Sequence, residues 1–151
     1  EHLAAAIVEA ILNELYQEIA AHQKSDKRIV LSCVEEEPHQ IGVKMVSDLF
    51  EMNGWYSYFL GANTPTKDLL GYIRVVNPDL IGISVSIYFH LPTLEDLLRR
   101  IRQKFPEVPV LVGGQAFLRG GEEVLEAYSH IYYKPDLRSV ESFINEFTQN
   151  G

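Results

Sequence analysis

Short apolar runs alternate with helical patterns along most of the chain. Runs rich in β-branched and apolar residues predict strands near residues 28–34, 55–60, 79–86, 108–113 and 130–133. Apolar residues at helical spacing predict helices near residues 40–52, 66–76, 93–104, 121–127 and 136–148. Each predicted strand is therefore followed by a predicted helix, in five consecutive units.

Some of the predicted strands, such as 80–83 and 108–112, are continuously apolar and do not alternate with polar residues. Strands of this kind are buried on both faces, which happens when helices cover both sides of a parallel sheet. We predict an α/β fold with a five-stranded, doubly wound parallel sheet. Five such units favour the flavodoxin-like strand order 2-1-3-4-5, in which ligands bind between the first and third strands.

A separate amphipathic pattern precedes the first strand. Apolar residues recur at helical spacing from Leu3 to Ile19 and predict a helix over residues 3–22, whose apolar stripe needs a partner. The chain begins with Glu1 and enters this pattern directly, so we expect further sequence before it.

Composition excludes several classes of function. The 151 residues, 46% of them hydrophobic, suit one compact domain. A formal net charge of -8 argues against nucleic-acid binding by this segment, although an attached DNA-binding domain stays open. Cys33 is the single cysteine, and the sequence has neither a signal-like opening nor an apolar run of about 18 residues. We expect a cytoplasmic protein without a membrane segment.

The loop after the first predicted strand carries the most informative residues, Glu37-Pro38-His39-Gln40-Ile41-Gly42. A carboxylate two residues from an imidazole can accept the Nδ1 hydrogen, which leaves Nε2 free to coordinate a metal. In a parallel sheet this loop opens where ligands bind, and the loop carrying Ser84 faces it if the strand order is correct. The pattern therefore predicts a metal ligand at His39.

Three loops together resemble those of a known family. Residues 37–42 are close to a D-x-H-x-x-G motif, residues 81–86 match an S-x-L region at Ser84, and residues 112–114 match a double-glycine loop. Over residues 27–149 the chain resembles the cobalamin-binding domains of corrinoid methyl-carrier proteins and cobalamin-dependent regulators. In that family a helical bundle often covers the cofactor, so residues 1–24 would be the end of such a bundle.

The resemblance implies that the chain binds cobalamin with the nucleotide base detached from cobalt. His39 would be the lower axial ligand of the cobalt, and Glu37 would orient its ring. Glycines would let the backbone approach the nucleotide tail, and the Ser84 hydroxyl would face the buried base. The full set of residues that the resemblance assigns to the cofactor is Glu37, His39, Gln40, Ile41, Gly42, Ser84, Ser86, Tyr88, Gly113, Gly114, Gln115 and Phe117.

Ordinary structural roles stay open for most of these residues. Gly42 suits helix packing, residues 113–114 suit a turn after a strand, and Ser84 suits a strand end. Tyr88 equally suits packing against the final helix. Residues 35–37 also suit a solvated acidic run beside a helix N-terminus.

Two positions depart from the commonest form of the family. Glu37 stands where an aspartate is usual, and the E-x-H-x-x-G version is similar to that of cobalamin-dependent regulators. Methyl-transferring members often carry a serine near the position of His90, so their proton relay is not expected here. His90 lacks a partner at comparable spacing, as do His2, His22 and His130, and we expect these four to be structural or exposed.

Other nucleotide-binding and signalling classes fit the sequence less well. A receiver domain needs an aspartate after the third strand, where this chain has Ser84-Val85-Ser86. Glutamates in the loop after the first strand would repel the phosphate of a flavin or dinucleotide.

We therefore expect a cobalamin-binding module that is not an enzyme on its own and serves as a cobalamin-dependent sensor or regulator. The alternative is a corrinoid protein that carries methyl groups between methyltransferases. The corresponding partners are an attached regulatory or DNA-binding domain in the first case and a methyltransferase in the second.

Overall fold

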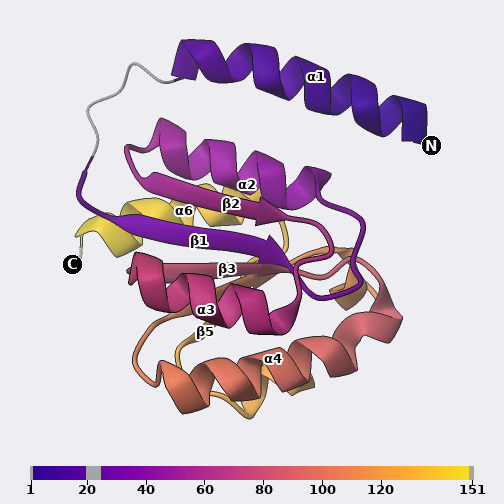
Figure 1. The fold of residues 1–151 in the computed structure, drawn as a ribbon, viewed down its shortest axis with the longest axis vertical. Helices are drawn as coiled ribbons and strands as arrows, with labels where there is room; N and C mark the ends of the chain where they lie inside the picture. Colours follow the sequence, from indigo (N-terminus) through magenta and orange to yellow (C-terminus); the bar gives the residue numbers. More distant parts are fainter. Residues whose placement is uncertain (1, 20–24, 150–151) are drawn as a thin grey trace.

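A computed structural model describes residues 2–19 and 25–149. Its centre is one parallel sheet with the order β2-β1-β3-β4-β5, which confirms the predicted fold and strand order (Figure 1). The strands are β1 (Arg28–Cys33), β2 (Tyr56–Gly61), β3 (Leu80–Ser84), β4 (Val110–Gly113) and β5 (Ile131–Tyr133). The α-helices are α1 (His2–Ile19), α2 (Ile41–Met52), α3 (Thr66–Val76), α4 (Leu91–Lys104), α5 (Glu123–Glu126) and α6 (Leu137–Gln149).

Helices cover both faces of the sheet. Helices α2 and α6 lie on one face, and α3 and α4 lie on the other (Figure 1). Successive residues of β1 point to opposite faces, so Ile29 and Leu31 pack toward α2 and α6 while Val30 packs toward α3 and α4. This double burial accounts for the continuous apolar runs of β3 and β4.

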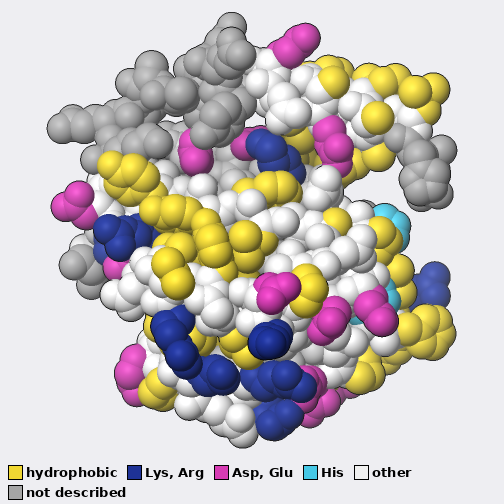
Figure 2. Space-filling model, viewed as in Figure 1, with side chains coloured by type: hydrophobic (Ala, Val, Ile, Leu, Met, Phe, Trp, Pro, Cys, Tyr) yellow, Lys and Arg dark blue, Asp and Glu magenta, His cyan; other side chains and the backbone are white. Residues whose placement is uncertain are grey.

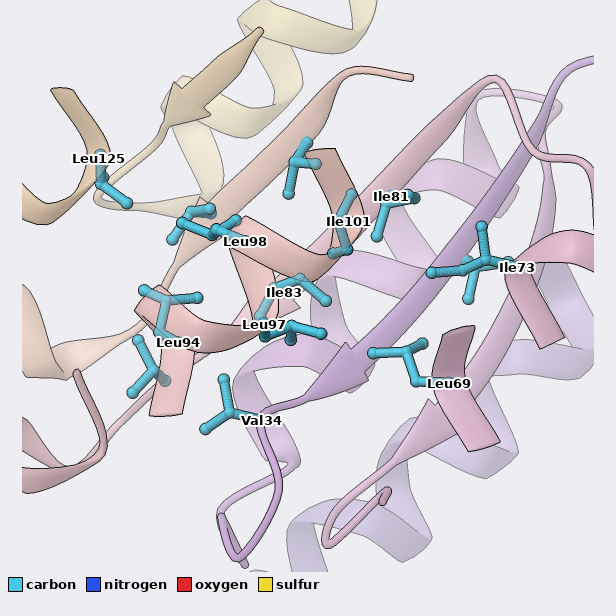
Figure 3. Close-up of a cluster of buried hydrophobic side chains, with 14 of the residues drawn as sticks. Val34, Leu69, Ile73, Ile81, Ile83, Leu94, Leu97, Leu98, Ile101 and Leu125 are labelled. Carbon is cyan, nitrogen blue, oxygen red and sulfur yellow. The ribbon is translucent and has the colours of Figure 1, made fainter. Parts of the chain in front are cut away.

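The larger core lies beneath α3 and α4. Figure 3 shows leucines and isoleucines of both helices meeting Ile81 and Ile83 of β3. The labelled helix residues are fully or almost fully buried: Leu69, Ile73, Leu94, Leu97, Leu98 and Ile101. This packing holds the carboxyl end of β3 in place beneath the loops described below.

The third strand is shorter than the predicted span of 79–86. It ends at Ser84, and a 3-10 helix η1 (Tyr88–His90) follows. The backbone N–H groups of Ser86 and Ile87 donate to a glutamate side chain instead of a strand carbonyl, so strand pairing stops there. A second 3-10 helix, η2 (Gln115–Phe117), follows β4.

The fifth helix is also shorter than the predicted span of 121–127. Helix α5 comprises only Glu123–Glu126. Gly120 and Gly121 precede it with φ values of 95° and 99°, which lie in the left-handed region and are incompatible with an α-helix.

Helix α1 lies against α2 on the outside of the molecule (Figure 1). Leu12 shares a hollow of about 400 Å³ with side chains of α2 and α6, so part of the predicted apolar stripe has a partner. Leu3, Ile7 and Ile11 stay 51–75% exposed. Residues 20–22 of the predicted helix lie outside the described residues. No helix in the described ranges combines the length and the apolar composition that crossing a bilayer requires.

Candidate functional site

The carboxyl ends of β1 and β3 form the topological switch point of the sheet. The chain leaves β1 toward β2 on one side and leaves β3 toward β4 on the other. Cys33 pairs with Ser84 in the ladder, and the Val34 N–H donates to the Ser84 carbonyl at 3.1 Å. The loop after β1 and the loop after β3 therefore start side by side at the position where open α/β sheets bind ligands.

One buried carboxylate joins these two loops. The Glu37 side chain is 0% exposed. Its Oε1 accepts hydrogen bonds from the His39 backbone N–H at 3.2 Å and from the His39 ring at 2.6 Å. Its Oε2 accepts from the backbone N–H groups of Ser86 at 2.9 Å and Ile87 at 3.0 Å, and contacts His90 Nδ1 at 3.1 Å. Both carboxylate oxygens thus have hydrogen-bond partners. Those of Oε1 lie in the loop after β1, and those of Oε2 lie in the segment after β3.

A tight turn directs the Glu37 side chain inward. Glu36 has a φ of 66°, in the left-handed region, and the Glu37 N–H donates to the Val34 carbonyl at 3.1 Å. The Glu37 carbonyl accepts from the Asn63 N–H at 3.0 Å, which ties the turn to the loop after β2. Glu35 and Glu36 are exposed, so the acidic run is split between solvent and interior.

The Glu37 carboxylate is ionised at neutral pH. Burial raises its pKa, but the hydrogen bonds from His39, from the Ser86 and Ile87 amides and from His90 outweigh burial and lower the pKa from 4.5 to about 2. Burial, together with the negative charge of Glu37, raises the pKa of the neighbouring Cys33 thiol to about 12. Cys33 therefore stays protonated and donates from Sγ to the His39 carbonyl at 3.4 Å.

The His39 ring faces outward from this anchor. Its side chain is 55% exposed, while Nδ1 lies 2.6 Å from the Glu37 carboxylate. An ionised carboxylate has no hydrogen to give, so Nδ1 must donate and Nε2 is left with a free lone pair in the neutral ring. The site thus presents one coordinating nitrogen with a fixed tautomer, which suits a metal that brings its other ligands with it.

His90 has a partner that its sequence spacing does not reveal. Its Nδ1 lies 3.1 Å from Glu37 Oε2, and its side chain is 18% exposed. The contact joins residues 53 positions apart and depends on η1, which the sequence pattern did not predict. The sequence signal that could have indicated this contact is the position of His90 itself, shortly after the third strand and near the switch point.

Of the remaining histidines, only the side chain of His130 is described, and it does not contact the site. His130 is 46% exposed, and its Nε2 lies 3.9 Å from a carboxylate oxygen of Glu107. His22 lies outside the described residues, and so does the side chain of His2.

The three glycines assigned to the cofactor occupy different surroundings. A Cβ on Gly42 would meet no atom within 4 Å, so close helix packing does not require this glycine. Gly114 has a φ of 115°, and a Cβ there would lie 2.1 Å from the Val85 carbonyl oxygen. A Cβ on Gly113 would lie 3.1 Å from the Lys134 carbonyl oxygen. Gly42 alone of the three borders open space, whereas Gly114 is required by its φ and by the close approach of Val85, and Gly113 ends β4 close to the backbone at Lys134.

The other assigned residues divide between the switch point and the core. Ser84 ends β3 and is 8% exposed, and Ser86 contributes its N–H to Glu37. Tyr88 is 45% exposed, and its ring contacts the ring of Phe89 at 6.3 Å between centroids. Phe117 is 3% exposed and packs on the ring of Tyr133. Phe117 is therefore a core residue beneath the loops.

Gln40 connects the start of α2 to the loop after β2 and to α1. Gln40 Oε1 accepts from the Ala62 N–H at 3.0 Å, and its Nε2 donates to Glu9 Oε1 of α1 at 3.1 Å. Ile41 is the partly exposed first residue of α2, and Gln115 is exposed at the start of η2.

The sequence comparisons identify one family. A family model for the B12 binding domain matches residues 27–135. The HTH-type transcriptional repressor CarH of Myxococcus xanthus is 33% identical over 117 residues, which cover 77% of this chain and 38% of the repressor. Dimethylamine corrinoid protein 1 of Methanosarcina acetivorans is 31% identical over 105 residues, which cover 68% of this chain and 49% of that protein.

A solved structure shares the fold. The monomethylamine corrinoid protein of Methanosarcina barkeri superposes with a TM-score of 0.75 at 16% identity, covering 90% of this chain and 65% of that chain. The chain spans less than half the length of the two curated relatives above.

The depressed pKa of Glu37 predicts a specific loss of stability in acid. In the unfolded chain the carboxylate protonates near 4.5, but in the folded protein it protonates only near 2. Its contribution is fully present above pH 4.5 and is lost as the pH falls to about 2. That contribution amounts to about 3 kcal/mol, so Glu37→Gln should lower the free energy of unfolding most at neutral pH.

Urea denaturation of both proteins at a series of pH values measures this difference. The gap in the free energy of unfolding should be larger above pH 4.5 than near pH 2, where the Glu37 carboxylate becomes protonated in both states. A gap of equal size at every pH would contradict the assignment.

Proposed function

Because the chain belongs to the B12 binding domain family, we propose that it holds cobalamin with the nucleotide base detached and with His39 Nε2 as the lower axial ligand of cobalt. Cobalamin or a related corrinoid is the cofactor of this family. When bound, its cobalt supplies an exchangeable upper position that can carry an alkyl group. The residues of this chain bind the cofactor and orient its ligand.

The observation that carries the proposal is the geometry of Glu37 and His39. The carboxylate lies 2.6 Å from Nδ1, and the ring is 55% exposed, so the free nitrogen points away from the anchor. Two backbone N–H groups from the loop after β3 hold the carboxylate. The ring orientation is therefore set before any ligand arrives. Loss of such an outer partner typically lowers metal affinity or activity about 10 to 100-fold.

The surroundings of Gly42 fit a threaded nucleotide tail. The glycine lies in the first turn of α2, three residues after His39, and space beside it is open. Any side chain at this position would project into that space. We propose that Gly42 and Ser84 border the slot for the tail, and that Gly113 and Gly114 shape the loop on its other side.

Sensing is the role that we favour for the bound cofactor. Glu37 contacts a second imidazole, His90, at the position where methyl-transferring members often have a serine. One of the curated relatives is a transcriptional repressor. We propose that cobalamin repositions a helical cap, which includes α1, and changes self-association or the action of an attached DNA-binding domain. The chain is then a cytoplasmic binding module without catalytic residues of its own.

Methyl carriage is the second candidate, because another curated relative is a dimethylamine corrinoid protein. In that role the partner would be a methyltransferase, and the upper face of the cofactor would be presented to it.

Replacement of His39 tests the ligand assignment. Purified protein is mixed with hydroxocobalamin and desalted, and its visible spectrum is compared with that of His39→Ala. The variant should lose most of the cofactor or show a clearly shifted spectrum, because a methyl group cannot coordinate cobalt. His130→Ala is the matched control, since that imidazole is 46% exposed and lies away from Glu37. Retained cofactor with an unchanged spectrum in His39→Ala would refute axial ligation.

The two functional roles predict different behaviour of the loaded protein. A sensor should change its oligomeric state on size-exclusion chromatography when cobalamin is added. A carrier should stay unchanged in size and, once its cobalt has been reduced by an added strong reductant, should accept a methyl group from a methylamine in the presence of a methylamine corrinoid methyltransferase. Methyl acceptance without any change in size would overturn the sensor role.

A further inference from the structure

Basic side chains gather on the outer side of α3 and α4, as the dark blue cluster in Figure 2 shows. They line a hollow of about 420 Å³ between the two helices. We call this surface the basic hollow, and define it by Lys67, Gly71 and Arg74 of α3 and Arg99, Arg100 and Lys104 of α4. A chain with a net charge of -8 thus concentrates five of its 13 lysines and arginines on one small surface.

The positive charge of the basic hollow is largely uncompensated. Arg99 and Arg100 share a single carboxylate, Asp96, whose oxygen lies 2.7 Å from the Nε of Arg100. Among the residues that the structure describes, Lys67, Arg74 and Lys104 have no carboxylate within 4.0 Å. Four net positive charges therefore face solvent over two helices.

A glycine leaves the floor of the basic hollow bare. Gly71 lies in the middle of α3, where glycine is less stable than alanine. A Cβ there would meet no atom within 4 Å, so packing does not require the glycine. Its effect is to open the space between the helices to an inserted group.

An apolar strip adjoins the basic hollow on α3. Val75 is 82% exposed, and Tyr72 is 37% exposed three residues before it, on the neighbouring face of the helix. Arginine and tyrosine are enriched in protein interfaces and among the residues that contribute most to binding.

We propose that the basic hollow binds an acidic, partly apolar segment of a partner protein. Carboxylates of that segment would pair with Arg74, Arg99 and Arg100, since guanidinium groups bind carboxylates in a bidentate manner. Its apolar residues would lie on Tyr72 and Val75. The cluster is confined to two helices, and acidic side chains lie beside it in Figure 2, so an extended nucleic acid would meet repulsion at its edges. None of these residues belongs to the candidate cobalamin site.

Fluorescence anisotropy with the whole chain tests the proposal. The probe is a fluorescein-labelled peptide with repeats of Glu-Glu-Leu, and the comparison peptide has lysine in place of glutamate. Only the acidic peptide should bind, and it should bind more weakly as salt is raised, because exposed charges are screened. A labelled DNA duplex is titrated in parallel.

Two variants and a matched control locate the binding site. Arg74→Glu should lower the affinity for the acidic peptide about tenfold or more, since it replaces an attraction between opposite charges by a repulsion between like charges. Gly71→Gln should also weaken binding of the acidic peptide, because its side chain would fill the floor of the basic hollow. The open space at this position allows the variant to fold, and circular dichroism checks that it does. Arg138→Glu changes an exposed arginine of α6, on the opposite side of the sheet, and should bind as the parent does apart from a small effect of net charge.

Three results would overturn the proposal. They are the absence of measurable binding by the acidic peptide, an equal loss in Arg138→Glu and Arg74→Glu, and tighter binding of duplex DNA than of the acidic peptide.

Discussion

The buried Glu37 carboxylate is the interaction on which the candidate site depends. It accepts hydrogen bonds from the loop after β1 and from the loop after β3, and it carries a full negative charge without exposure to solvent. A buried carboxylate is stable only when its oxygens are paired, so both loops must keep their positions for the charge to be tolerated. The same constraint fixes the His39 tautomer. The Glu37 side chain thus determines both the positions of the two loops and which ring nitrogen of His39 is free to coordinate.

The parts of this arrangement that follow from the sequence are local. The period of the apolar residues predicts the strands and helices. The spacing of Glu37 and His39 predicts their contact, because side chains two residues apart in a tight turn lie within reach of each other. His90 and the shortened β3 were not predicted, since both depend on Glu37 reaching across to residues about 50 positions later. No pattern within a single element contains that information.

The basic hollow shows the same limit. Lys67 and Arg74 lie seven residues apart on one face of α3, which the sequence displays. Their assembly with Arg99 and Lys104 appears only when α3 and α4 pack beside each other on the sheet. The hollow also begins near the site, because Thr66, next to Lys67, donates its hydroxyl to Glu35 in the loop after β1. The start of α3 therefore lies between the loop proposed to bind the cofactor and the basic hollow.

The most direct test of this account is the tautomer of His39 in the protein without cofactor. Two-bond ¹H–¹⁵N correlation spectra at about pH 8, above the ordinary pKa of imidazole, distinguish the protonated from the unprotonated ring nitrogen. Assignment of the His39 signals follows from their loss in His39→Ala. The account predicts hydrogen on Nδ1 and a free Nε2 in the parent protein, and a mixture of tautomers in Glu37→Gln. Hydrogen on Nε2 of His39 in the parent protein would contradict it.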